Sequence, residues 1–342
     1  MRVPWGDSAF GGVRLLRQRL DNSLKSRPDA TLGLVRMALC GYLFVVRMGP
    51  EGRAFLKHLR HPPGILHAPL FDMVGLSYPP GPQTAALLAS SLSVLAGLGM
   101  IGLCTRPALA LLALCWLYTG SVSSGFGFFH HTPALAEQVL IALVVLPGTT
   151  ALSFDRLLWR AIARRGSWRE ALVPSVPRFG VPLLAGAIGC VYAAAGISKL
   201  RFGAVAWLDG STLAAHLRGI HTQLWYAPDG VVSDFKHGVE GYVYLGGGNV
   251  WAIWLSKSRI IMVIGSWAAL LFELLGPILM LQGPAGRAAF IVAASLFHAG
   301  VSLLLGPAFV VWLVVLWALF PWAWAQERFA AWRISRGAAS RG

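Results

Sequence analysis

Long apolar stretches separated by short polar connections run along most of the chain. A helix needs roughly 17 to 25 mainly apolar residues to cross a bilayer. Eight stretches approach that length, covering residues 31 to 48, 84 to 103, 107 to 124, 134 to 152, 179 to 199, 260 to 281, 288 to 305 and 307 to 325. Thr105 before Arg106-Pro107 and Thr132 before Pro133 are typical helix starts. The pattern predicts an all-α integral membrane protein, a bundle of about eight transmembrane helices.

Composition agrees with a membrane protein. Of the 342 residues, 56% are hydrophobic and 13% are charged, and the mean hydropathy is +0.62, so the apolar content exceeds what one soluble core needs. The net charge of +15 comes without a nucleic-acid-binding motif, so we expect no nucleic acid partner. The four cysteines form no C-x-x-C pair or His/Cys cluster, and we expect neither a disulfide nor a metal site.

Basic residues predict the orientation. They gather in three groups: Arg2, Arg14, Arg17, Arg19, Lys25 and Arg27 before the first window; Arg156, Arg160, Arg164, Arg165, Arg169 and Arg178 after the fourth; Arg328, Arg333, Arg336 and Arg341 after the eighth. With eight spans these groups share one face, which the positive-inside rule makes cytoplasmic. We therefore expect both termini in the cytoplasm, with three regions: a basic amphipathic N-terminus (1–30), a membrane domain (31–325) and a basic tail (326–342).

Ionisable residues inside the windows need an explanation because charge is costly in a bilayer. Lys199 lies at the outer end of the fifth window, where it could simply anchor the helix by reaching water. Alternatively, a poorly hydrated pocket could leave its amine neutral and able to accept a proton. Arg36 and Arg47, near opposite ends of the first window, are most simply explained as residues that extend to the membrane surface.

Several other polar residues are candidates for a site or for structural pairs. His130 and His131 precede the fourth window, on the same predicted face as Lys199, and they are either interfacial residues or neutral imidazoles near a helix N-terminus. Glu137 lies about one turn further along, at a depth where it could pair with Lys199.

Glu273 and His298 are predicted at similar heights in the membrane, where they would form either a structural contact between helices or a proton relay. The outer loop holds four tryptophans, Trp207, Trp225, Trp251 and Trp254. They either line a pocket or, as we expect for most of them, belong to the aromatic belt of the interface.

Four stretches resemble one known family. They read LGLVRMALCGYLF, HHTPALAEQVLIALVVLPGTTALSFD, AGISKLRFGAVAWLDG and LFHAGVSLLLGPAFVVWLVVLWALFPW, in that order. Together they resemble the horizontally transferred transmembrane (HTTM) domain family, which includes the vitamin K-dependent gamma-glutamyl carboxylases. The resemblance implies a catalytic base at Lys199, which would deprotonate a reduced quinone of vitamin K or menaquinone type. It also implies a helper histidine at His131 or, as the second choice, at His130.

The resemblance leaves two functions open. The first is a quinone-linked, carboxylase-like enzyme with an outward-facing pocket and a peptide or protein substrate on the outer face. The alternative is a non-catalytic partner subunit, or a lipid- or peptide-binding protein, of the same fold. Carboxylases carry a large lumenal region after the membrane domain, whereas residues 326–342 follow the last window here, so carboxylation of protein glutamate itself is not expected. We expect a multi-pass protein of a bacterial plasma membrane.

Overall fold

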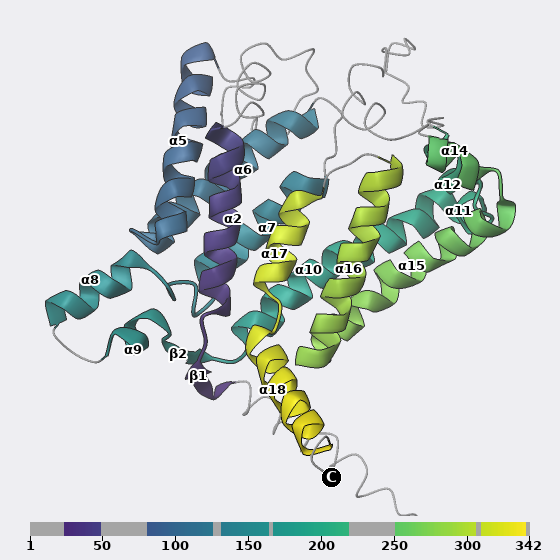
Figure 1. The fold of residues 1–342 in the computed structure, drawn as a ribbon. Coiled ribbons are helices and arrows are strands. Elements are labelled where there is room, and N and C mark those ends of the chain that lie inside the picture. The colour runs from purple at the N-terminus through teal and green to yellow at the C-terminus, as the bar shows by residue number, and fades with distance from the viewer. Residues whose placement is uncertain are drawn as a thin grey trace, which may run out of the picture. The chain divides into compact units, whose positions relative to one another are not determined.

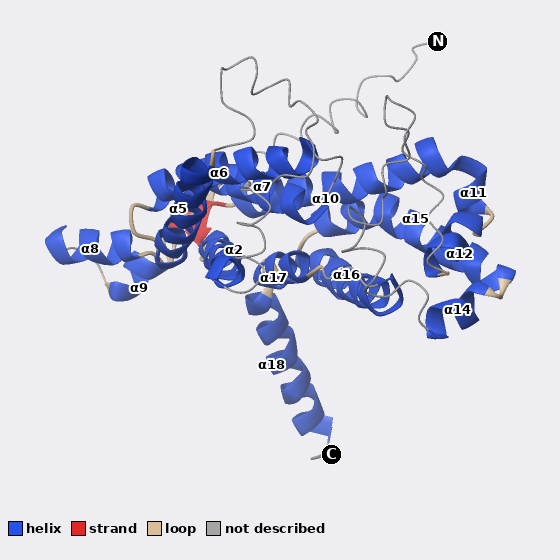
Figure 2. Cartoon of the chain, turned by 90° about the horizontal axis from the view of Figure 1, so that it is seen from above, coloured by secondary structure: helices blue, strands red, loops and turns tan. Residues whose placement is uncertain are grey.

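The fold is described from a computed structural model. It describes residues 24–48, 81–125, 131–163, 167–218, 250–305 and 309–339, and helices make up nearly all of them (Figures 1 and 2). The chain divides into two compact units. Unit 1 consists of Met1–Phe126 and Ala136–Leu184, and unit 2 consists of Gly127–Leu135 and Ala185–Gly342.

Unit 1 is built from helices that pack side by side. Its elements are β1 (Ser26–Pro28), α2 (Thr31–Met48), α5 (Pro82–Ile101), α6 (Thr105–Gly125), most of α7 (His131–Val145), α8 (Phe154–Ala163), α9 (Trp168–Leu172), β2 (Ser175–Pro177) and the start of α10 (Gly180–Ser198). Helix α2 packs against α5, and α5 packs against α6. Strands β1 and β2 pair antiparallel, with Ser26 opposite Pro177. This pairing ties the start of α2 to the segment that leads into α10.

Arg36 of α2 is the buried polar centre of unit 1. Its side chain is fully enclosed, at 0% exposure, and its guanidinium donates hydrogen bonds to five backbone carbonyls, those of Gly99, Met100, Thr149, Ala151 and Leu152. The first two belong to the last turn of α5, where carbonyls lack intrahelical partners. The expectation that Arg36 extends to the membrane surface is therefore wrong, because these carbonyls satisfy its donors inside the unit. The side chain of Arg47 lies outside the described residues.

Asp155, in the first turn of α8, fixes the start of α6. One carboxylate oxygen accepts from the backbone N–H of Cys104 (2.8 Å), and the other accepts from the backbone N–H and the hydroxyl of Thr105 (both 2.7 Å). Burial raises the pKa of Asp155, but these hydrogen bonds and the nearby Arg36 guanidinium outweigh it and hold the pKa below its ordinary value. The folded state therefore favours the charged carboxylate.

Asp155→Asn should destabilise the protein in a pH-dependent way. A hydrogen bond to a charged group contributes about 1.5–3 kcal/mol, and we expect a loss of roughly that size at neutral pH. Because the folded pKa is lowered, the stabilisation is present above the unfolded pKa and is lost as pH falls through the folded pKa. Unfolding in detergent from pH 7 downward should show the variant and wild type converging in acid. Glu327→Gln, at an exposed carboxylate of α18, is the control, and a variant deficit independent of pH would contradict the prediction.

Unit 2 contains the rest of α10 and the C-terminal half of the chain. Its further elements are the π-helix η1 (Lys199–Gly203), α11 (Ala204–Leu208), α12 (Ser211–Leu217), α14 (Val250–Ser256), α15 (Arg259–Leu281), α16 (Pro284–Leu305), α17 (Val310–Ala318) and α18 (Trp322–Ala339). Helices α15 and α16 pack together, and Gly276 permits this because a Cβ there would lie 2.8 Å from the ring of Phe290. Small residues allow such close helix contacts within membranes.

Each of the eight predicted windows falls on a helix, but fewer helices meet the length and composition of a membrane span. Four of the described helices do so: Gln83–Ile101, Gly180–Arg201, Arg259–Leu281 and Pro284–Leu305. The last predicted window is not one straight helix, because α17 and α18 are bent by 63° at the break between them. Pro321 lies in this break, where it cannot continue a helix. Counting the bent pair as one span gives five, so the number of about eight stays a prediction.

Candidate functional site

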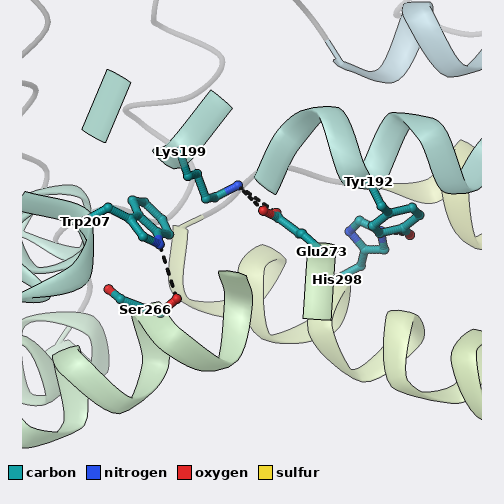
Figure 3. A network of polar contacts seen from close by, with 6 residues as sticks. All are labelled: Tyr192, Lys199, Trp207, Ser266, Glu273 and His298. Atoms are coloured by element: carbon teal, nitrogen blue, oxygen red, sulfur yellow. Dashed lines mark hydrogen bonds and ion pairs between the residues drawn. The ribbon is translucent and has the colours of Figure 1, made fainter. Parts of the chain in front are cut away.

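An ion pair between Lys199 and Glu273 is the centre of the candidate site (Figure 3). The Nζ atom of Lys199 lies 2.6 Å from Oε1 and 2.7 Å from Oε2 of Glu273. The Glu273 side chain is only 5% exposed, whereas that of Lys199 is 24% exposed. The pair therefore joins a buried carboxylate in the middle of α15 to an amine that remains accessible.

A glycine one turn before Lys199 permits this contact. A Cβ at Gly196 would lie 2.9 Å from the side chain of Leu274 and 3.2 Å from Cβ of Glu273. A larger residue would therefore push α10 away from α15 at the level of the ion pair. The small residue in the stretch AGISK thus has a specific role, which is to bring the end of α10 against Glu273.

The backbone around Lys199 is irregular. The α-helix ends at Ser198 and continues as η1, a π-helical turn that begins at Lys199. Ala204, directly after η1, has a φ of 38°, which is unusual for a residue with a side chain. Short π-helical segments and strained residues cluster at functional sites because the surrounding structure must hold them. This irregularity supports a site at Lys199.

Trp207 lies beside the amine of Lys199. Its ring centroid is 5.2 Å from Nζ, within the range of a cation–π interaction. The indole Nε1 donates a hydrogen bond to the backbone oxygen of Ser266 at 3.2 Å. The ring is buried, whereas Trp251 and Trp254 are exposed, so the belt interpretation does not describe Trp207. The hydroxyl of Ser266 is buried and has no hydrogen-bond partner in the structure.

His298 belongs to a second polar contact. Its Nε2 atom lies 2.7 Å from the hydroxyl of Tyr192 on α10, and its Nδ1 atom is buried without a hydrogen-bond partner. Aromatic rings surround the two residues: Phe272, Phe290, Phe297, Phe309 and Trp312. The structure thus gives Glu273 and His298 different partners, where the sequence predicted that they pair with each other. Both are buried in unit 2, and whether either serves as a relay stays a prediction.

Of the other predicted site residues, the structure describes Glu137 fully and the histidines only in part. Glu137 is partly buried in α7 and belongs to unit 1, so its pairing with Lys199 stays a prediction, whereas the carboxylate that Lys199 contacts is Glu273. His131 is the first residue of α7, but its side chain is not described, and His130 lies outside the described residues. Within the described part of the chain, no group of three or more metal-ligating side chains occurs.

Sequence reasoning missed Tyr192, and it left Trp207 as a residue either of a pocket or of the aromatic belt. Tyr192 lies seven residues before Lys199, which is about two turns of a regular helix, a spacing that places two residues on one face. That spacing was the available signal, and in the structure both residues contact α15, Tyr192 at Phe272 and Lys199 at Glu273. The sequence gives no comparable signal that Trp207 lies beside Lys199, because the irregular backbone of η1 and Ala204 separates the two residues and is not visible in the hydrophobic pattern.

The fold and these contacts define the class of protein. Several long apolar helices, with polar groups paired inside them, are typical of a multi-pass integral membrane protein. The family model of the HTTM domain matches residues 25–323, and the chain belongs to this family. No curated protein and no solved structure is matched by the chain.

Proposed function

We propose that this HTTM-domain protein is a membrane-embedded enzyme in which Lys199 and Glu273 form an acid–base pair for quinone-linked chemistry. The observation that carries the proposal is the contact of a partly exposed amine with a carboxylate that is 5% exposed. An isolated charge is costly in such surroundings, which favours a paired arrangement of the two groups. Because the amine and the carboxylate are in contact, a proton can pass between them.

The pair gives the amine a route to become a base. When the proton on Nζ passes to a carboxylate oxygen 2.6 Å away, both groups become neutral, which reduces the cost of holding charge in a medium of low dielectric constant. The neutral amine then has a lone pair that can accept a proton from an acidic group placed beside it. Glu273 would serve as the proton store, and Lys199 as the group that meets the substrate.

The surroundings of the pair fit a reduced quinone. Trp207 offers a ring face next to the amine, and the buried Ser266 hydroxyl is an unused hydrogen-bond donor. Ile197 and Leu200 are exposed beside Lys199, which would let a lipid-soluble molecule approach from the membrane. When bound, a reduced quinone supplies an acidic hydroxyl and electrons for reaction with oxygen. Lys199 would take the hydroxyl proton, and His131 would assist, as the family resemblance implies.

A non-catalytic role remains the second candidate, and the geometry of the same pair favours it. Both oxygens of Glu273 contact the amine, and this fastens η1 to α15 as a purely structural ion pair would. In that case the protein would act as a partner subunit, or bind a lipid or peptide on its outer face. A bacterial plasma membrane location and cytoplasmic termini are part of either proposal.

Lys199→Arg separates the two candidates. Arginine keeps the positive charge and the contact with Glu273, but it cannot give up its proton. For a catalytic lysine we expect Lys199→Arg to abolish proton abstraction from a reduced menaquinone analogue while the melting temperature in detergent stays close to wild type. Arg201→Gln, two residues along the same segment, is the matched control and should retain activity. A Lys199→Arg protein that turns over the analogue like wild type would overturn the enzyme proposal.

A further inference from the structure

Helix α8 carries an uncovered apolar face. Phe154, Leu158 and Ile162 recur every four residues and therefore lie on one side of the helix. None of the α8 residues is buried, and exposure reaches 70% at Trp159 and 72% at Ile162. Large apolar side chains gathered on one exposed face are uncommon on a surface that meets only water.

The opposite side of α8 is basic and turned toward α9. Arg156 donates from Nε to the backbone oxygen of Ala171 at 2.6 Å. The guanidinium of Arg160 lies 3.8 Å from the ring centroid of Trp168. Figure 1 shows α8 and α9 next to each other, and Figure 2 shows the same neighbourhood from above. Helix α9 therefore contacts the arginine side, which stays partly exposed, and leaves the apolar side free.

Hydrogen bonds at the start of α8 fix its position relative to the ends of α5 and α6 in unit 1. The backbone N–H of Asp155 donates to the backbone oxygen of Gly102 (3.0 Å), the residue that caps the end of α5. The Asp155 carboxylate in turn binds the N–H groups of Cys104 and Thr105, where α6 starts. Helix α8 thus begins at the point where one apolar helix ends and the next one begins. In a protein that crosses a bilayer, such a turn lies at the boundary between acyl chains and water.

We propose that α8 is an interfacial helix whose apolar face, formed by Phe154, Leu158 and Ile162, inserts among the lipids of the membrane surface. Trp159 at the edge of this face fits the headgroup region, where tryptophan is enriched. The arginines on the far side hold positive charge at the level of lipid phosphates, which favours an anionic leaflet. This membrane contact is independent of the chemistry proposed for Lys199.

Spin labels on α8 test the proposal directly. The full chain would be placed in vesicles of phosphatidylcholine and phosphatidylglycerol, with Cys104, Cys115 and Cys190 replaced by alanine. Cys40 is kept because its side chain is fully buried and cannot meet the label, so that only the introduced cysteine reacts. The two labelled variants are Ile162→Cys on the apolar face and Ala163→Cys, the matched control on the arginine side. Accessibility to oxygen, which concentrates in lipid, is compared with accessibility to a water-soluble nickel complex.

We expect the label at position 162 to favour oxygen and the label at position 163 to favour the nickel complex. Further labels from position 157 onward should repeat this preference with a period of about 3.6 residues. Equal access of the nickel complex to both positions would place the apolar face in water and overturn the proposal. Protection of position 162 from both reagents would also overturn it, because a protein partner or a second copy would then cover the face. Elution like wild type in detergent verifies that each labelled variant is folded.

Discussion

Arg36→Met should destabilise the protein more than any surface substitution, with a loss of at least about 3 kcal/mol in the free energy of unfolding. The guanidinium of Arg36 donates to five backbone carbonyls inside unit 1. Methionine fills a similar volume but donates nothing, so these carbonyls would be buried without partners. Each buried acceptor left unsatisfied costs about 1–3 kcal/mol, and partial relaxation or entry of water keeps the total below the simple sum.

Unfolding of purified protein by a denaturing detergent, followed by circular dichroism, measures this effect. Arg36→Lys should recover only part of the loss, because an ammonium has three donors and lacks the planar fork of arginine. Arg106→Met is the matched control: Arg106 is an exposed arginine in the first turn of α6, and its replacement should change the unfolding midpoint little. An Arg36→Met protein that unfolds at the wild-type detergent fraction would show that the carbonyls do not depend on Arg36.

The hydrophobic pattern and the residue types that start and end helices predicted much of the helical fold. The window 31 to 48 coincides with α2, and the predicted start at Thr105 is the first residue of α6. These predictions succeed because they depend on local physics: the apolar length that a span requires and the residue types that begin a helix. The same reasoning failed at the last window, where it treated Pro321 as part of a continuous span and missed the bend between α17 and α18.

Long-range polar contacts were harder to predict. Arg36 binds carbonyls more than 60 residues away, and a backbone carbonyl has no signature in the sequence. Lys199 was identified as a candidate, but its carboxylate partner lies 74 residues further along. Estimates of depth matched Lys199 with Glu137 and Glu273 with His298, because height in a membrane does not fix which face a helix turns to its neighbour. The glycine contact between α10 and α15 makes that choice in the structure.

The ion pair of the candidate site gives the second large effect. Lys199→Ala should lower the free energy of unfolding by about 3–5 kcal/mol, because it leaves the carboxylate of Glu273 buried and unpaired. Glu273→Gln should cost less. The amide oxygen can still accept from the amine, and the Lys199 side chain is already 24% exposed, so its charge can turn toward water. A larger loss of stability for Lys199→Ala than for Glu273→Gln is what one buried partner, Glu273, and one accessible partner, Lys199, should produce.

A double replacement distinguishes pairing from simple packing. Lys199→Met combined with Glu273→Leu removes both charges while keeping apolar volume, and buried ion pairs replaced in this way are often neutral or stabilising. We expect the double variant to recover most of the stability that Lys199→Met alone loses, in a double-mutant cycle measured by unfolding in a denaturing detergent. The recovered protein should still be inactive, because its proton-exchanging groups are gone. Equal losses for Lys199→Met, Glu273→Leu and the double variant would instead mean that the two residues act as one packing unit. Full additivity of the single losses would mean that their contact contributes nothing to stability.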